Sequence, residues 1–201
     1  HHLLVLARDP EGYARLGAAI SRAQMAGEKG APRCSLTDLV GRGGDHWLVL
    51  TGCRKGAVAR ALTRDGPHAA AHELARLVDA FGREHVAVEL WDHGDPLDSA
   101  RNDALVQLAL RAGVDPVATN NVHYATPARR PLATALSAVR ARRSLDEIDG
   151  WLPAGAGAHL RSGAEQARRF ARYPGVVERA AALGRECAFD LALVAPRLPD
   201  F

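Results

Sequence analysis

The chain has 201 residues, enough for one sizeable core or for one domain with a small appendage. Apolar residues make up 47% of it and charged residues 24%, and no stretch approaches the ~20 apolar residues that a transmembrane helix needs, which excludes a membrane protein. The formal net charge of +3 is too small to indicate a nucleic-acid-binding protein by itself.

The start of the chain and its cysteines indicate whether the sequence is a fragment and in which redox environment the protein works. Residues 1–7 have no initiator methionine and no basic segment before a short apolar run, so they resemble neither a signal peptide nor a natural start. We therefore expect a fragment of a longer protein whose front is missing. Cys34, Cys53 and Cys187 are widely spaced and form no CxxC pair, which favours a reducing, cytoplasmic setting.

Apolar runs of strand length alternate with amphipathic segments in the first part of the chain. The runs predict buried strands at residues 3–7, 47–51, 86–90 and 116–118. The segments between them predict helices at residues 10–26, 57–62, 67–81 and 97–112. Asp9, Pro10 and Glu11 supply an N-cap, a first-turn proline and an acidic first turn for the first of these helices.

The order of these elements predicts the class of fold. Apolar strands that alternate with amphipathic helices indicate an α/β protein with a mainly parallel sheet and right-handed crossovers, open or closed into a barrel. Because the carboxyl ends of parallel strands meet at one edge of a sheet, side chains just past those ends are expected to gather there.

Polar side chains follow three of the predicted strands. Cys53 lies between two glycines after the second strand, the polar cluster within residues 89–93 ends the third, and Asn121 and His123 follow the fourth. Thiolate, carboxylate and imidazole groups at one edge predict a metal site. A lone histidine or cysteine is also commonly a structural residue, and that alternative stays open. His2 precedes its strand, so it can join the site only if that strand bends or runs differently.

The chain after Tyr124 predicts a small helical appendage. Helices are expected at residues 132–142, 162–173 and 174–187, followed by a proline-bearing connector at residues 196–199. Serine and glutamate recur there at the spacing of a capping box: Ser144 with Glu147, and Ser162 with Glu165. A glycine-rich loop lies between the two pairs.

Arginines gather in this tail, whereas the chain has lysine only at Lys29 and Lys55. Such a cluster indicates phosphate binding or, because arginine replaces lysine almost everywhere, an ordinary solvated helix surface. Both interpretations stay open. The arginines are Arg129, Arg130, Arg140, Arg142, Arg143, Arg161, Arg168, Arg169 and Arg172.

Four segments resemble the successive motifs of a known family. They are residues 2–7 with Gly12 and Tyr13, residues 51–56 (Thr-Gly-Cys-Arg-Lys-Gly), residues 89–94 (Glu-Leu-Trp-Asp-His-Gly) and residues 118–124 (Ala-Thr-Asn-Asn-Val-His-Tyr). In order and spacing they resemble the polymerase-and-histidinol-phosphatase (PHP) domain at the front of bacterial C-family DNA polymerases, over essentially the whole chain. Residues 120–125 and 139–147 are most similar to the error-prone branch of that family.

The resemblance implies a distorted seven-stranded β/α barrel of PHP type, present in part, with a small C-terminal helical appendage. It implies a barrel at residues 1–127 that lacks its first strands, and a helical extension at residues 128–201 that leads toward the polymerase palm. Residues 159–162 and 198–201 resemble the segment that joins the barrel to the palm.

The resemblance also implies a metal site at the strand ends. His2, Cys53 and His123 match ligand positions of the family, and Asn121 matches a position where the metal-binding version has aspartate. The remaining ligands would lie upstream of His1. An amide offers a cation one neutral oxygen, whereas aspartate offers a full negative charge, so we expect a weak or absent zinc or manganese site. No catalytic residue is expected in this segment, and magnesium would serve the polymerase part outside it.

Three hypotheses of function follow. The first is the PHP domain of an error-prone DNA polymerase that acts in damage-induced mutagenesis and translesion synthesis, with a structural role and a vestigial site. The alternative is an active metal-dependent phosphoesterase or 3′–5′ proofreading exonuclease. The third is an interaction module that contacts DNA or other mutagenesis and replication proteins through the arginine-rich tail.

Overall fold

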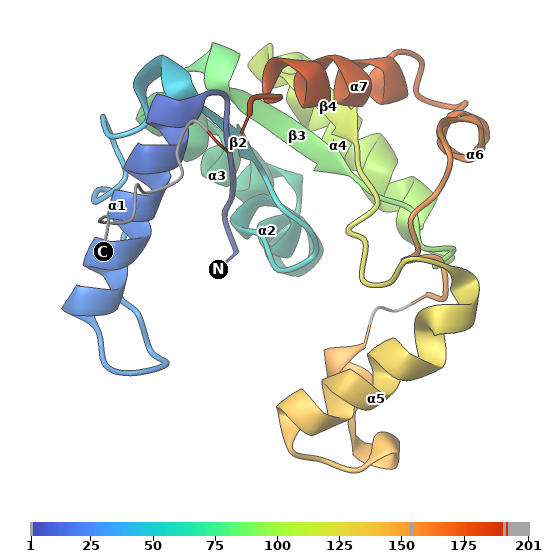
Figure 1. Cartoon of the computed structure of the whole chain (residues 1–201). Coiled ribbons are helices and arrows are strands. Elements are labelled where there is room, and N and C mark those ends of the chain that lie inside the picture. The colour runs from blue at the N-terminus through green and yellow to red at the C-terminus, as the bar shows by residue number, and fades with distance from the viewer. Residues whose placement is uncertain (1, 153–154, 191, 193–201) are drawn as a thin grey trace.

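The computed structural model describes residues 2–152, 155–190 and 192, and there four strands form one mixed sheet flanked by helices (Figure 1). The strands follow the order β1 (Leu4–Ala7), β2 (Trp47–Leu50), β3 (Val86–Leu90), β4 (Asp115–Ala118). The α-helices are α1 (Pro10–Ala26), α2 (Ala57–Asp65), α3 (Pro67–Phe81), α4 (Asp98–Ala112), α5 (Arg130–Ala141), α6 (Gly163–Arg169) and α7 (Val176–Glu186). Short 3₁₀ turns are η1 (Gly44–His46), η2 (Arg83–His85), η3 (Pro127–Arg129), η4 (Leu145–Glu147) and η5 (Asp149–Trp151).

The direction of β1 differs from the prediction. Strands β2, β3 and β4 are parallel, which confirms the βαβ crossovers, but β1 pairs antiparallel with β2, with Leu4 opposite Leu50 and Ala7 opposite Trp47. The start of β1 therefore lies beside the carboxyl end of β2. As a result, His2 bridges to Gly56, and its backbone N–H donates to the carbonyl of Lys55 at 3.1 Å.

The sheet is open rather than closed into a barrel. The described residues form four strands, with β1 and β4 at the edges, so the seven-stranded barrel is not present in this part of the chain. A cavity of about 700 Å³ borders β1 and is lined largely by apolar side chains, among them Leu4, Ile20 and Leu36. Leu4 and Ile20 are 41% and 55% exposed. The edge strand therefore presents an apolar surface that the described residues leave uncovered.

Helices cover both faces of the sheet. Alternate residues of each strand face opposite sides. One side packs on α2, α3 and α4 in a core that contains Val49, Val58, Leu74, Val88, Leu90 and Leu105. The other side is smaller, and there Leu183 of α7 contacts a cluster formed by Leu48, Leu50, Ala87 and Val117.

The caps confirm part of the sequence reading. The Asp9 carboxylate accepts the backbone N–H of Gly12 at 2.7 Å, as expected for the N-cap of α1. The Ser162 hydroxyl accepts the N–H of Glu165 at 3.2 Å and caps α6. Ser144 instead donates to the carboxylate of Glu147 at 3.1 Å, and only a short 3₁₀ turn follows.

The tail differs from the prediction in its helix ends. Helix α6 stops at Arg169, short of the expected end near Tyr173, and α7 begins at Val176 after Gly175, whose φ is +85°. A left-handed residue at that point interrupts a continuous helix. The predicted connector at residues 196–199 lies outside the described residues.

Helix α5 stands apart from the sheet. Figure 1 shows it in a lobe together with η4 and η5, on the side of the strand carboxyl ends, whereas α7 returns to the sheet. The division of the chain at residue 127 stays a prediction. No helix in the described part of the chain is long and apolar enough to cross a membrane.

Candidate functional site

A small pocket of about 110 Å³ lies at the carboxyl ends of β2, β3 and β4. All four residues that the sequence singled out for metal binding line it: His2, Cys53, Asn121 and His123. Their side chains make no hydrogen bond within the described part of the chain. Three loops and the start of the antiparallel edge strand thus bring these groups together, and His2 is included because β1 is antiparallel.

The turn after β2 places Cys53 at the pocket. Gly52 has a φ of +81°, which favours glycine, and a Cβ added to Gly56 would lie 2.1 Å from the carbonyl oxygen of Thr51. The Gly56 N–H donates to the Cys53 carbonyl at 2.7 Å and closes the turn. The glycines that flank the cysteine in sequence therefore serve a turn that presents its side chain, and Cys53 is a partly buried free thiol.

A buried carboxylate organises the loop after β3. Asp98, which is 3% exposed, accepts the backbone N–H groups of His93 at 2.7 Å and Asp95 at 3.0 Å, and pairs with Arg101 at 2.7 Å. The Arg101 guanidinium stacks over the Trp91 ring at 3.9 Å. Both oxygens of Asp98 are thus engaged in shaping the loop, although the residue borders the pocket.

The loop after β4 is held by an amide next to the candidate ligands. Asn120 is 6% exposed, and its NH₂ group donates to the carbonyls of Gly157, at 3.1 Å, and His159. Asn121 follows with a φ of 41°, a left-handed conformation that asparagine and aspartate tolerate better than most residues. Asn120 is therefore structural, and its neighbour turns toward the pocket.

Residues 155–161 pack behind this pocket. Gly155 lies so close to the backbone of His93 that an added Cβ would be 2.2 Å from its carbonyl oxygen. The buried Arg161 guanidinium donates to the carbonyls of Asp92 and Gly157, both at 2.6 Å. The glycine-rich loop that the sequence showed after residue 150 is thus a close-packed support for the strand-end loops.

Two residues of the predicted polar cluster do not line the pocket. Glu89 is 3% exposed, and its carboxylate accepts the Thr119 hydroxyl, whereas its second oxygen has no partner within the described residues. Burial raises the pKa of Glu89. Asp92 pairs with Arg169 at 2.9 Å. His93 does line the pocket, together with the Trp91 ring.

The electrostatic environment of the pocket favours uncharged imidazoles. Burial lowers the pKa of His2 below its usual value, and the neighbouring cation Lys55 lowers it further. Burial also lowers the pKa of His123, with further contributions from His93, Lys55 and Arg54. The two cations are the feature that sequence reasoning missed. Their position in the turn beside Cys53 was the available signal.

The charged side chains around the pocket disfavour a bound divalent metal. Within residues 2–152, 155–190 and 192, no three His, Cys, Asp or Glu side chains are arranged to hold a metal ion. Arg54 and Lys55 line the same pocket and would repel a cation, and the Asp98 oxygens are engaged elsewhere. Asp95 is the other carboxylate there. Metal binding by His2, Cys53, Asn121 and His123 stays a prediction.

Comparison with known proteins finds one matching domain family and several similar DNA polymerases. Residues 1–93 match the PHP domain. Over its whole length the chain is 58% identical to an error-prone DNA polymerase of Mycolicibacterium paratuberculosis, 56% to that of Mycobacterium tuberculosis strain H37Rv and 52% to that of Nocardia farcinica. Each match covers 100% of this chain and 18% of the relative, so the chain spans less than a fifth of their length.

Proposed function

We propose that this chain, which matches the PHP domain over residues 1–93, is a segment of an error-prone DNA polymerase with a structural role and a strand-end site that no longer hydrolyses phosphoesters. The identity to error-prone DNA polymerases over the full length of the chain supports the first part. Nucleotidyl transfer with magnesium is then the task of other parts of the polymerase.

Asn121 is the observation that carries the loss of hydrolysis. It lines the pocket beside His123, where an aspartate would give a metal a negatively charged ligand. The amide offers one neutral oxygen, and its NH₂ group points partial positive charge at any cation. Metal-dependent hydrolysis requires a firmly held ion that polarises a phosphoryl oxygen or activates water. The exchange removes the charge that such an ion needs.

The charge of the surrounding side chains supports the same conclusion. Lys55 and Arg54 border the pocket; burial is the main cause of the lowered pKa of His2 and His123, and Lys55 lowers both further. A positive charge that disfavours an imidazolium also disfavours Zn²⁺ or Mn²⁺ at the same place. The imidazoles of His2 and His123 and the thiol of Cys53 still line the pocket, in loops that backbone hydrogen bonds hold in place.

The apolar cavity at β1 supports a larger barrel in the complete polymerase. The edge strand and the exposed side chains of Leu4 and Ile20 present a surface on which further strands would pack. We infer that other parts of the polymerase extend this sheet toward the seven-stranded PHP barrel. The segment then supports the polymerase through its core and through residues 128–201, which lead toward the palm.

The setting of the whole protein follows from the same proposal. A polymerase of this kind acts on DNA in the cytoplasm of a bacterium, in translesion synthesis and damage-induced mutagenesis, with other mutagenesis or replication proteins as partners.

A working phosphoesterase or 3′–5′ exonuclease is the second candidate. The observation that favours it is the convergence of His2, Cys53 and His123 on one pocket, because imidazole and thiolate are good ligands for zinc or manganese. Residues elsewhere in the polymerase would have to supply the acidic ligands.

Two experiments on the full-length polymerase test the polymerase assignment and the loss of the metal site. Primer extension with magnesium on a primed template, including one with a damaged base, is expected. After dialysis against metal-free buffer without a chelator, zinc and manganese content well below one ion per chain is expected. Near-stoichiometric zinc or manganese that disappears in both Cys53→Ser and His123→Ala would sink the structural proposal in favour of the phosphoesterase.

A further inference from the structure

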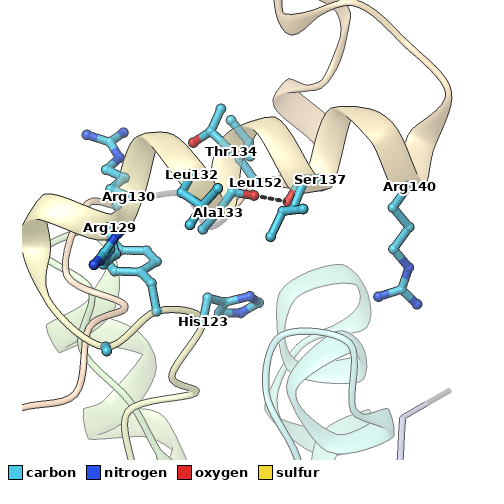
Figure 2. Close-up of a pocket in the computed structure, with 13 residues that line it drawn as sticks. His123, Arg129, Arg130, Leu132, Ala133, Thr134, Ser137, Arg140 and Leu152 are labelled. Carbon is cyan, nitrogen blue, oxygen red and sulfur yellow. Dashed lines mark hydrogen bonds between the residues drawn. The ribbon is translucent and has the colours of Figure 1, made fainter.

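A second cavity, separate from the strand-end pocket except for His123, lies along α5. It has a volume of about 420 Å³ and lies between this helix, the loop after β4, Leu152 and Gly155 (Figure 2). Its charged lining consists of Arg129, Arg130 and Arg140. No acidic residue lines it within the described residues. The groove is therefore positively charged at both ends of α5.

These three arginines have no partner among the residues that the structure describes. All are exposed, and within the described part of the chain none makes an ion pair or a side-chain hydrogen bond. Other arginines of the tail do: Arg169 pairs with Asp92 at 2.9 Å and Arg172 with Asp103 at 2.7 Å. The arginine-rich tail thus contains arginines that pair within the fold and others that do not, and three of the unpaired arginines lie on this groove, whereas Arg142, Arg143 and Arg168 lie outside it.

The floor between the arginines is apolar. Leu132 and Leu136 are one helical turn apart on α5 and remain 53% and 60% exposed, with Ala133 beside them. The Ser137 hydroxyl is already bound to the Ala133 carbonyl at 2.9 Å, as Figure 2 shows. A ligand for this groove therefore needs negative charge at both ends of the helix and flat apolar surface between them.

We propose that the α5 groove binds single-stranded DNA, with phosphates on the three arginines and bases against the leucine floor. The proposal rests on the proposed function, because it assumes a segment of a DNA polymerase. Ten residues separate Arg130 from Arg140, which corresponds to about 15 Å along the helix and about four phosphates of a stacked strand. Figure 2 shows Arg129 and Arg130 near one end of α5 and Arg140 near the other.

A single strand matches the groove better than a duplex or an acidic peptide. A duplex keeps its base faces stacked inside, so its phosphates could use the arginines but nothing would cover Leu132 and Leu136. A cavity of about 420 Å³ also suits a small part of a strand. An acidic peptide could neutralise the arginines without supplying flat surfaces. Bases of a single strand supply both needs, since every base has an apolar face.

The groove does not depend on hydrolysis. It shares His123 with the strand-end pocket, and Arg140 is close enough to His2 to contribute to the lowering of its pKa, which burial and Lys55 mainly cause. Positively charged side chains therefore border both the groove and the pocket. A strand held on α5 would pass the pocket without needing a metal there. The positive charge that disfavours a metal at the pocket favours the phosphates of a passing strand.

Cross-linking of DNA to the full-length polymerase tests the groove. An oligothymidylate of about 12 nucleotides that contains 4-thiothymidine is irradiated with the protein, and the cross-linked peptides are located by mass spectrometry. We expect cross-links within residues 122–140. In the variant R129Q/R130Q/R140Q their yield should fall on the order of tenfold or more at ~0.1 M salt, because three lost phosphate contacts lower the salt exponent by about 2.

A matched variant controls for net charge. R22Q/R64Q/R111Q removes the same number of exposed arginines from α1, α2 and α4 and should leave these cross-links unchanged. Absence of cross-links at residues 122–140, equal loss in both variants, or binding of polyglutamate but not oligothymidylate would each overturn the proposal. Primer extension in the same preparation separates the two claims: without it the polymerase assignment fails, whereas extension without these cross-links removes only the groove.

Discussion

His93 donates the hydrogen of its Nε2 atom to the backbone carbonyl of Asn120, 2.6 Å away, and so joins the loops that follow β3 and β4. A carbonyl oxygen only accepts hydrogen bonds, so the neutral ring carries its proton on Nε2. Burial lowers the pKa of His93, which favours this neutral form near neutral pH. The relative position of Asn121 and the loop after β3 depends on this bond.

Replacing His93 tests the hydrogen bond between the loops that follow β3 and β4. In His93→Leu, the carbonyl of Asn120 would lose its partner in a buried place, at a cost of about 1–3 kcal/mol. We expect lower thermal stability of this segment in the full-length protein, measured by peptide-resolved proteolysis during heating. His72→Leu, at an exposed position of α3, should have little effect. Equal stability of the two variants would show that this hydrogen bond is unimportant.

The stability of the segment should depend on pH through the same ring. Because the pKa of His93 is lower in the folded state than the ordinary histidine value of 6.5, the unfolded state binds more protons as the pH falls. Stability from this group is therefore complete above about pH 6.5 and is lost below it. The unfolding temperature should fall between about pH 7 and pH 5.5, and His93→Leu should fall less steeply. Parallel curves for the two proteins would contradict this assignment.

Glu89 should show the opposite dependence. Burial raises its pKa above 4.5, so the unfolded state loses its proton first and stability from this group declines as the pH rises past 4.5. Glu89→Gln keeps an oxygen for the Thr119 hydroxyl and removes the charge. We expect its unfolding temperature relative to the parent protein to be higher at about pH 7.5 than at pH 5. A difference that does not change with pH would argue against a buried carboxyl that resists ionisation.

The close packing behind the pocket can be tested with two glycines. Gly155→Ala would place a Cβ 2.2 Å from the carbonyl oxygen of His93, so the loop must move, at a cost of about 1–3 kcal/mol. Gly184→Ala, within α7, meets nothing within 4 Å and should stabilise by about 0.5–1 kcal/mol. The unfolding temperatures of the two variants should therefore move in opposite directions. A neutral Gly155→Ala would mean that the loop yields easily.

Much of the fold could be predicted because buried elements have recognisable patterns of apolar residues in the local sequence. Strands β2 and β3 are fully buried; β2 appears as an unbroken apolar run, and in β3 only Glu89 interrupts the run. Asp9 and Pro10 mark the start of α1. The direction of β1 could not be read, since an apolar run has the same appearance in either direction. Only its pairing with β2 shows the antiparallel arrangement, and this is what brings His2 to the pocket.

The site was predictable in position but less so in composition. Placement after strand ends brought Cys53, Asn121 and His123 together as expected. The same argument wrongly included Glu89, because residues within a strand alternate between its two faces and Glu89 lies on the side of Ala87. The structural use of Asn120 depends on contacts with residues 157–159, far along the chain, which no local pattern reveals.

The most direct test of the lost hydrolysis is digestion of a mismatched primer by the full-length polymerase. Primed, mismatched DNA is incubated with manganese or zinc and no nucleotides, and loss of the 3′ nucleotide is followed for the parent protein, His123→Ala and Asn121→Asp. Asn121→Asp serves as the sensitised form, because aspartate tolerates the left-handed backbone there. If hydrolysis has been lost, the parent protein and His123→Ala show the same negligible rate. Robust 3′–5′ digestion by the parent protein that disappears in His123→Ala would contradict this loss.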